Sequence, residues 1–166
     1  MIPWGVVVFA HGLEGRPDGR KGTALGEAGF KLVAPDGRNR SLADRVRGLE
    51  AALRTRSDVV LVGSSYGGLA AMVVASRQPE RLRGLVLLAP ALVWSEPPVD
   101  DPDALTVPSA LPCIVIHGTR DEVIPIQKSR DLALRSPHIQ LWERDDDHVL
   151  RRSLPQLITA VRQLGG

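Results

Sequence analysis

A serine set among glycines is the residue of this sequence with the clearest potential for covalent chemistry. Gly63-Ser64-Ser65-Tyr66-Gly67 matches the pattern G-x-S-x-G and stands between an apolar run and a helix-forming segment, the context in which the pattern presents a nucleophile. Glycines two positions away on either side remove the collisions that so tight a turn would cause. Only Ser65 has both glycines, so we predict Ser65 as the nucleophile and Ser64 as a neighbour packed beneath the turn.

Two further residues could activate this serine. A serine hydroxyl is a weak nucleophile unless an imidazole accepts its proton, and the imidazole needs a carboxylate that holds its tautomer. Asp121 lies in "HGTRDEVIP" and His148 in "RDDDHVL", each just after an apolar run. The order serine, acid, histidine is the one that accompanies a G-x-S-x-G turn. We therefore predict Asp121 as the orienting acid and His148 as the general base.

Both partners also have purely structural interpretations. Asp121 could be a turn or capping residue before the segment that follows it, and His148 could be a solvated loop histidine. One of the three aspartates at 145–147 could replace Asp121 as the orienting acid. His117 is predicted to be a strand-end residue, and His138, which precedes its strand, to lie at the opposite edge of the sheet.

The first apolar run ends in a turn that could stabilise an oxyanion. "VVVFAHGLEG" places Leu13 just after a His-Gly pair, where a backbone N–H can face a reacting carbonyl. We predict the N–H groups of Leu13 and Tyr66 as the two donors of an oxyanion hole, in which one donor typically contributes about 10²–10³ in rate. His11 is interpreted as a support of the turn, with a substrate contact as the alternative.

The elements that must position these residues alternate between strands and helices. Six apolar runs are continuous, as in strands buried on both faces of a parallel sheet: Val6–Phe9, Lys31–Ala34, Val59–Val62, Leu85–Leu88, Ile114–Ile116 and Gln140–Trp142. Helical patterns lie between them. One has Leu42, Val46, Leu49 and Leu53 on a single face, with Ser41 as its N-cap. The alternation predicts an α/β fold with a doubly wound, mainly parallel six-stranded sheet and helices on both faces.

One segment interrupts this alternation. Residues 91–111 carry four prolines and no sustained periodicity, which predicts a long irregular loop, a type of connection that is often functional. Leu92 and Trp94 in this loop, and Val123 and Ile124 after Asp121, are candidates for the apolar walls of an open acyl-binding site. For Trp94 and Ile124, ordinary packing of the loops is the alternative.

The length, charge and cysteine content of the chain predict its domain count and exclude several classes of protein. The chain has 166 residues, a formal charge of +2 and one cysteine, which predicts one domain over residues 1–166, no intrachain disulfide, and a buried structural thiol at Cys113. The sequence has no arginine-rich block with interleaved aromatic residues, so we do not expect nucleic acid as a partner. The N-terminal stretch lacks the pattern of a signal peptide, and no apolar run is long enough to span a membrane. We expect a cytoplasmic protein without cofactor or metal, of unknown oligomeric state.

The quoted motifs together resemble those of the α/β-hydrolase superfamily. "FAHGLEG", "GSSYGG", "GTRDEVIP" and "DDDHVL" occur in the appropriate order, and the chain is most similar to small bacterial esterases that lack the first two strands and any cap domain. The resemblance implies a strand order of 2-1-3-4-5-6. It also implies Ser65 as nucleophile, Asp121 as acid, His148 as base, and Leu13 and Tyr66 as oxyanion donors. Residues 91–111 occupy the usual point of cap insertion but are too few for a helical domain.

Two classes of function follow from these residues. The first is a serine hydrolase that cleaves carboxylic esters of short acyl chains through an acyl-enzyme intermediate. A thioesterase or a perhydrolase-like enzyme would use the same three residues. The second class is a non-catalytic binding protein on a hydrolase scaffold, which usually lacks one of the three. The sequence does not name the physiological substrate.

Overall fold

A six-stranded parallel sheet organises the protein. The structure is a computed structural model and describes residues 5–165; residues 1–4 and 166, which include the start of the stretch examined for a signal peptide, lie outside that range. The strand order is β2-β1-β3-β4-β5-β6, and every neighbouring pair is parallel. This confirms the predicted order. The strands are β1 (Val6–Ala10), β2 (Lys31–Val33), β3 (Val59–Ser64), β4 (Leu82–Leu88), β5 (Cys113–Gly118) and β6 (Gln140–Arg144).

The central strands are longer than their apolar runs. β4 begins at Leu82 instead of Leu85, and its pairing with β3 starts at Val59 and Leu82, with a register shift after Val59. β3 continues through Ser64, which pairs with Leu88. Backbone hydrogen bonds between neighbouring strands continue the ladder past polar residues and glycines that interrupt the apolar runs, such as Arg83 and Gly84 in β4 and Gly63 in β3. The sequence pattern therefore located the strands but underestimated their lengths.

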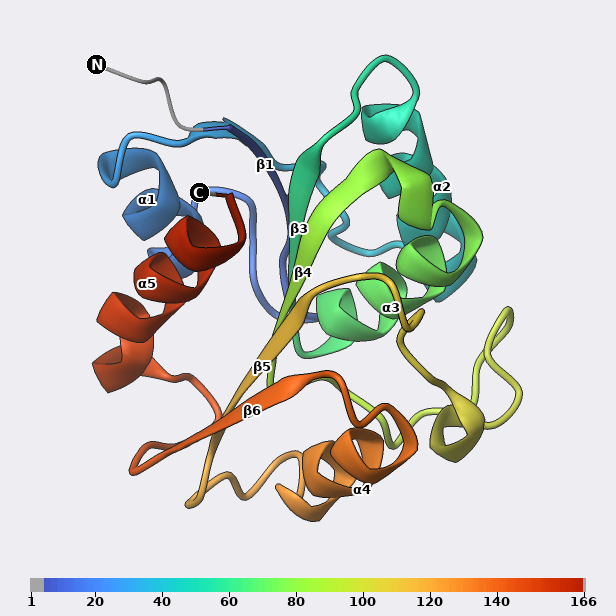
Figure 1. Cartoon of the computed structure of the whole chain (residues 1–166), viewed down its shortest axis with the longest axis vertical. Coiled ribbons are helices and arrows are strands. Elements are labelled where there is room, and N and C mark those ends of the chain that lie inside the picture. Colours follow the sequence, from blue (N-terminus) through green and yellow to red (C-terminus); the bar gives the residue numbers. More distant parts are fainter. Residues whose placement is uncertain (1–4, 166) are drawn as a thin grey trace.

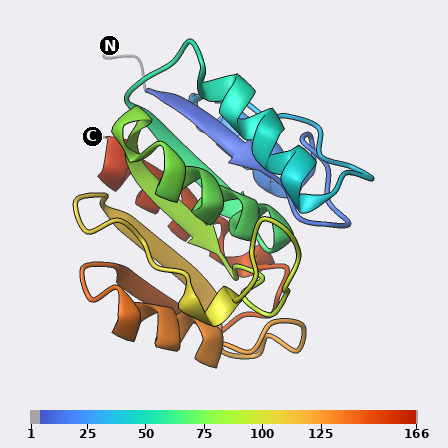
Figure 2. The same ribbon diagram turned by 90° about the vertical axis from the view of Figure 1, so that its right-hand side faces the viewer.

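Five helices cover the two faces of the sheet (Figure 1). They are α1 (Arg20–Glu27), α2 (Leu42–Leu53), α3 (Tyr66–Arg77), α4 (Gln127–Arg135) and α5 (Leu154–Gly165). Helices α1 and α5 lie on one face, and α2, α3 and α4 lie on the other, as Figures 1 and 2 show together. The doubly wound arrangement is confirmed. The predicted N-cap is also present, because the Ser41 hydroxyl accepts a hydrogen bond from the backbone N–H of Asp44 at 3.2 Å.

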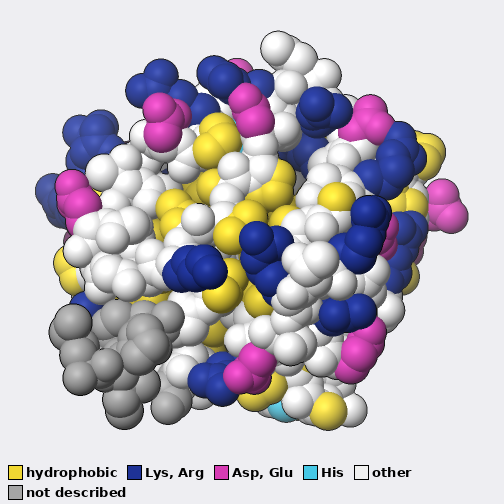
Figure 3. All heavy atoms as spheres, turned by 90° about the horizontal axis from the view of Figure 1, so that it is seen from above, with side chains coloured by type: hydrophobic (Ala, Val, Ile, Leu, Met, Phe, Trp, Pro, Cys, Tyr) yellow, Lys and Arg dark blue, Asp and Glu magenta, His cyan; other side chains and the backbone are white. Residues whose placement is uncertain are grey.

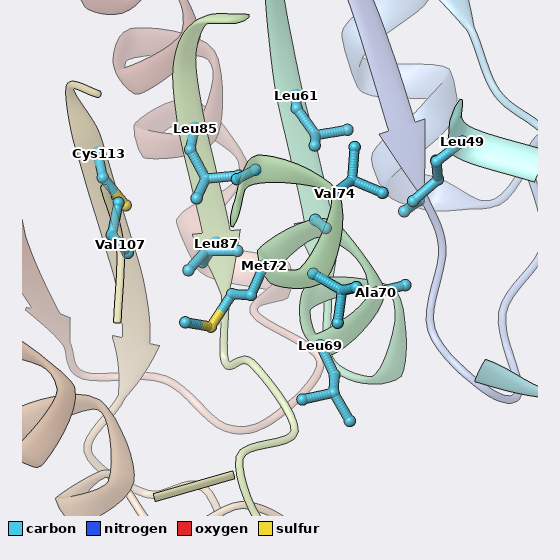
Figure 4. Close-up of a cluster of buried hydrophobic side chains, with 14 of the residues drawn as sticks. Leu49, Leu61, Leu69, Ala70, Met72, Val74, Leu85, Leu87, Val107 and Cys113 are labelled. Carbon is cyan, nitrogen blue, oxygen red and sulfur yellow. The ribbon is translucent and has the colours of Figure 1, made fainter. Parts of the chain in front are cut away.

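Helix α3 is the most deeply buried of these helices. All its residues from Tyr66 to Ala75 are buried, as expected for a helix that is apolar on nearly every side. Figure 4 shows Leu69, Met72 and Val74 of this helix among side chains from α2 and the strands of the sheet. Cys113 of β5 is part of the same core, and burial raises the pKa of its thiol, so it is the structural cysteine that the sequence predicted.

The segment between β4 and β5 is irregular, as expected. It contains one short 3₁₀ helix (Pro102–Ala104) and an isolated antiparallel bridge between Glu96 and Val99. Val99, Val107 and Leu111 are buried in the core beneath α3 and α4. The segment is therefore anchored to the domain at three points along its length.

The surface at the side where the central strands begin carries charges of both signs. In Figure 3, Lys and Arg side chains lie among Asp and Glu, with hydrophobic side chains visible between them. Among residues 5–165, none of the helices has the length and hydrophobicity needed to cross a bilayer.

Two histidines are buried within this fold, and both form hydrogen bonds as neutral rings. His11, directly after β1, is 2% exposed, and His117 of β5 is fully buried. The His11 Nε2 accepts a hydrogen bond from the Gly37 N–H at 2.9 Å, so its proton is on Nδ1, which donates to the Gly12 carbonyl at 2.7 Å. Burial is the main cause that lowers the pKa of both imidazoles.

We expect these two histidines to make the protein less stable in mild acid. Their pKa values are lower in the folded than in the unfolded chain, so the unfolded chain binds more protons once the pH falls below about 6.5. The free energy of unfolding should then decrease from pH 7 to pH 5, with a limiting slope of about 1.4 kcal/mol per pH unit for each histidine. Urea unfolding at a series of pH values measures this slope.

Matched substitutions separate the buried histidines from other titrating groups. His117→Gln should flatten the pH dependence between pH 7 and pH 5, whatever its effect on stability at pH 7. His138→Gln removes an exposed histidine and should leave the slope as it is. An identical slope in the wild type and in His117→Gln would contradict the assignment.

Candidate active site

The turn between β3 and α3 holds Ser65 in a strained conformation. Its backbone angles are φ 54° and ψ −115°, a combination that costs a non-glycine residue roughly 1–3 kcal/mol. The backbone around it is fully engaged. The Ser65 N–H donates to the Leu88 carbonyl at 2.9 Å, and the Ser65 carbonyl accepts from the Gly68, Leu69 and Ala91 N–H groups at 2.9–3.1 Å. These bonds from two neighbouring segments hold the serine in place.

The two flanking glycines are required by close packing. A Cβ on Gly63 would lie 2.7 Å from the Gly67 carbonyl oxygen, and one on Gly67 would lie 2.1 Å from the Ala10 carbonyl oxygen. Both distances are far shorter than real contacts allow. The start of α3 therefore packs directly on the carboxyl end of β1, and this contact explains in three dimensions why the motif selects Ser65 over Ser64.

Ser65, His148 and Asp121 form a continuous chain of hydrogen bonds. The Ser65 Oγ lies 3.0 Å from the His148 Nε2, and the His148 Nδ1 lies 2.7 Å from the Asp121 Oδ2. The three side chains come from three loops after β3, β5 and β6, which all open at the same edge of the sheet (Figure 2). Parallel strands place these loops together although the residues lie far apart in the sequence.

The neighbouring aspartates have other partners. The Asp146 Oδ2 accepts a hydrogen bond from the Ser153 hydroxyl at 2.8 Å, and the Asp145 carboxylate pairs with Arg120 at 2.8 Å. Asp147 accepts from the Val149 N–H at 3.0 Å. None of these carboxylates bonds to His148, whose carboxylate partner is Asp121.

The Asp121 carboxylate is saturated with donors, and one of them was not anticipated. Its Oδ1 accepts the N–H groups of Val123 and Ile124, each at 2.8 Å. Its Oδ2 lies 2.7 Å from His148 Nδ1 and 3.1 Å from the Nε2 of buried His117. The side chain of Asp121 is itself fully buried. Three hydrogen bonds and the contact with His117 restrict the movement of this carboxylate.

His117 therefore does more than end a strand. Its Nε2 faces two acceptors, the Asp121 carboxylate and the Ile124 carbonyl at 2.9 Å, so this nitrogen carries the proton. The Nδ1 then accepts from the Ser129 hydroxyl at 2.7 Å. The sequence could not reveal this role, because nothing in the spacing of His117 and Ser129 marks them as partners of Asp121.

The turn after β1 lies beside Ser65, and a buried arginine holds it. A Cβ on Gly12 would lie 3.6 Å from the Ser65 Cβ. Arg45 of α2 is 6% exposed, and its guanidinium donates to the His11 carbonyl at 2.5 Å and to the Gly12 carbonyl at 3.2 Å. The Gly12 carbonyl also accepts from His11 Nδ1 and from the Gly15 N–H at 3.2 Å.

These bonds orient the neighbouring amide. The Gly12 carbonyl and the Leu13 N–H belong to one planar peptide unit of trans geometry, so they point in opposite directions. Three donors on the Gly12 carbonyl therefore set the direction of the Leu13 N–H, away from Arg45. The Tyr66 N–H is at the first position of α3, where backbone amides have no acceptor within the helix.

Arg45 is itself held by the aromatic ring that follows Ser65. Its guanidinium carbon lies 4.8 Å from the centre of the Tyr66 ring, in the geometry of a cation–π contact. The Tyr66 hydroxyl donates to the Glu96 carboxylate at 2.8 Å, and this carboxylate also accepts the Leu42 N–H at 2.7 Å. Glu96 thus connects the irregular segment to both α2 and the turn at Ser65. Neither Arg45 nor Glu96 was identified from the sequence.

A cavity of about 600 Å³ opens in front of Ser65 and His148. Four of the six exposed large hydrophobic residues in the described chain line it, namely Leu13, Trp94, Val123 and Val149. Ile124, which is buried, also contributes to the wall. Trp94 packs edge-on against the Tyr66 ring at 4.9 Å between centroids and keeps 37% of its surface exposed.

The expectation for Leu92 is wrong. Its side chain is fully buried in the core on the side of α3 and does not line the cavity, whereas Ala91 does. Leu92 and Val93 form a turn in which the Leu92 N–H donates to the Pro90 carbonyl at 2.8 Å. This turn directs Leu92 into the interior, while Ala91 before it and Trp94 after it line the cavity. Leu13, Trp94, Val123 and Ile124 all reach the cavity.

Known proteins share this architecture. Residues 37–161 match a family model described as phospholipase/carboxylesterase. A hydrolase of the α/β superfamily from Xanthomonas campestris is similar over 99% of this chain and 98% of its own, with 27% identity and a TM-score of 0.80. Mouse α/β hydrolase domain-containing protein 10 is similar over 96% of this chain and 88% of its own, with 19% identity and a TM-score of 0.82. Est1E from Butyrivibrio proteoclasticus is similar over 96% of this chain and 85% of its own, with 18% identity and a TM-score of 0.80.

Comparison with curated protein sequences gave no significant match. The family model spans the larger part of the chain, including Ser65, Asp121 and His148, and the solved structures share its fold over nearly its full length. The chain therefore belongs to the phospholipase/carboxylesterase family of α/β-hydrolases.

Proposed function

We propose that this protein is a serine hydrolase that cleaves carboxylic esters through an acyl-enzyme intermediate. The observation that carries the proposal is the hydrogen-bonded chain Ser65–His148–Asp121 on a strained turn, at the wall of an open cavity. Membership of a family described as phospholipase/carboxylesterase supports ester hydrolysis. The intact set of three residues supports the proposal over a non-catalytic binding protein, which usually lacks one of them.

The proposed reaction begins when the Ser65 Oγ attacks the carbonyl carbon of the ester. The hydroxyl proton passes to His148 Nε2, and the Asp121 carboxylate stabilises the resulting imidazolium. The carbonyl oxygen becomes an oxyanion that accepts hydrogen bonds from the Leu13 and Tyr66 N–H groups. The direction that Arg45 gives to the Gly12–Leu13 peptide supports the first donor, and the free amide at the start of α3 supports the second.

The intermediate then collapses in two stages. The bond between the carbonyl carbon and the leaving oxygen breaks, and His148 gives its proton to the departing alcohol. A water molecule attacks the acyl-serine ester while His148 accepts one of its protons, and the carboxylic acid leaves as Ser65 recovers its proton. The apolar side chains at the cavity, Leu13, Trp94, Val123 and Ile124, are the proposed contacts of the substrate.

Replacing the nucleophile tests the proposal directly. Ser65→Ala should lower kcat on p-nitrophenyl acetate by about 10⁴-fold or more, because it removes the hydroxyl that is hydrogen-bonded to His148. The wild type should be labelled by a fluorophosphonate probe at Ser65. Ser64→Ala is the matched control and should keep most of the activity, since Ser64 is buried and His148 bonds to Ser65 instead. Full turnover by Ser65→Ala would refute the mechanism.

The shape of the cavity predicts a preference for short acyl chains. The cavity is open to solvent and has only a few apolar side chains at its rim, so it can cover a short chain but offers little apolar contact to the far end of a long one. The kcat/KM of p-nitrophenyl acetate and butyrate should therefore exceed that of the dodecanoate. Equal or rising kcat/KM up to the dodecanoate would indicate a longer apolar groove.

Arg45 should act on the rate without touching the substrate. Lysine cannot donate to the His11 and Gly12 carbonyls in the same bidentate way, so in Arg45→Lys the direction of the Leu13 N–H should be less well fixed. We expect kcat to fall by about tenfold or more, with little change in KM. Arg47→Lys is the control, because Arg47 is an exposed residue of the same helix. Urea unfolding confirms that the variant is folded, and an unchanged kcat in a folded Arg45→Lys would exclude the positioning role.

A further inference from the structure

One wall of the cavity is basic. Arg16, Arg20 and Lys21, called the basic wall here, line the same cavity as Ser65 and His148, and Glu14 is the one acidic residue among its described lining residues. Arg16 pairs with Asp18 at 3.2 Å, and both side chains are exposed. Within residues 5–165, the Arg20 guanidinium has no ion pair or hydrogen bond. The cavity therefore has an excess of positive charge beside its apolar rim.

The place of Arg20 and Lys21 in the sequence is unfavourable for the helix that contains them. Arg20 and Lys21 are the first two residues of α1, whose N-cap is Gly19 without a side-chain cap and whose first turn contains no acidic residue. The N-terminus of a helix is the positive end of its dipole, where each cation is unfavourable by about 0.3–1 kcal/mol and an anion is favoured. A local arrangement that opposes helix stability at a cavity wall is typical of a functional site.

Lys21 places the basic wall next to His148. Its ammonium group donates to the carbonyl of Val149, the residue that follows His148, at 2.8 Å. Burial, and then the positive charge of Arg20, lower the pKa of Lys21, and the carboxylates of Asp146 and Asp147 oppose this effect only in part. In the proposed reaction His148 delivers a proton to the departing oxygen or sulfur, so the leaving half of the substrate passes beside this wall.

The basic wall also continues beyond the cavity. Arg16, Gly19 and Arg20 line a second hollow of about 390 Å³, in which Thr23 and Leu154 also take part. Its acidic residues are Asp18, which pairs with Arg16, and Glu27 at the far end of α1. Arg16, Gly19 and Arg20 line both hollows, so the two lie side by side.

We infer that the substrate is an ester or thioester whose leaving half, the alcohol or thiol, carries a carboxylate or phosphate that Arg20 and Lys21 bind. The inference rests on the proposed function. A carboxylate or phosphate on this wall gains two cations and the unpaired amides at the start of α1, while the acyl half remains against the apolar residues of the rim. A neutral leaving group would gain neither of these contacts.

A pair of esters that differ by one charge tests this inference. 4-Acetoxybenzoate and 4-acetoxybenzamide have the same acyl group and leaving groups of similar size, and each kcat/KM is divided by the rate of hydroxide hydrolysis. The wild type should prefer the charged ester, and Arg20→Gln should reduce that preference by about threefold. Arg54→Gln removes an exposed arginine at the end of α2 and should leave the preference unchanged. Raising the salt concentration should weaken it in the wild type.

Two further substrates sharpen the assignment. 4-Acetoxyphenyl phosphate distinguishes a phosphate from a carboxylate as the preferred group, and preference for either supports the inference. The p-nitrophenyl esters of 4-carboxybenzoic and 4-carbamoylbenzoic acid carry the charge difference in the acyl half. A preference for charge only in the acyl half, or an equal loss of preference in Arg20→Gln and Arg54→Gln, would overturn it.

The failure of this inference differs from the failure of the proposed function. If Ser65 reacts with the fluorophosphonate and both acetoxy esters are hydrolysed with equal normalised kcat/KM, the anionic leaving group is wrong and the serine hydrolase stands. If the wild type neither reacts with the probe nor hydrolyses any of the esters, the proposed function fails and the inference fails with it.

Discussion

The direct contact of α3 with the carboxyl end of β1 is the constraint on which the site depends. Gly67 can approach the Ala10 carbonyl only because it has no side chain, and this approach forces the chain to turn from strand to helix within one residue. That residue, Ser65, takes a positive φ. The strain is carried by hydrogen bonds to Leu88, Gly68 and Ala91, and the buried α3 supplies the packing energy that maintains it.

The same contact brings the turn after β1 close to the serine and makes a second layer of support necessary. The Gly12 carbonyl must face away from the cavity, and the guanidinium of Arg45 holds it there. A buried cation is costly unless it is well bonded, and here the Tyr66 ring covers it while the Glu96 carboxylate holds the ring in turn. On the other side, His117 and two backbone amides hold Asp121. Both supports are polar and rest on a buried residue, Arg45 in the first and His117 in the second, as preorganised sites require.

Much of this arrangement could be predicted from the sequence, for physical reasons that operate locally or through strand order. The glycine spacing around Ser65 reflects steric limits within five residues. Asp121 and His148 could be placed because residues after parallel strands meet at one edge of the sheet. Arg45, Glu96 and the partnership of His117 with Asp121 could not be predicted, because each depends on how a helix or loop packs against a distant turn. The prediction that Leu92 lines the acyl-binding site was wrong for a related reason, since packing decides which side a loop residue faces.

The sequence by itself determined the alternation of strands and helices, the strand that carries the serine, and the register that selects Ser65. It did so because apolar periodicity and glycine spacing act between residues that are close along the chain. Only the tertiary structure decided which carboxylate bonds to His148 among Asp121 and the three neighbouring aspartates, and that basic residues at the start of α1 share a cavity with Ser65. Distances of about 3 Å between segments far apart in sequence arise from the packing of whole elements, which no local pattern encodes.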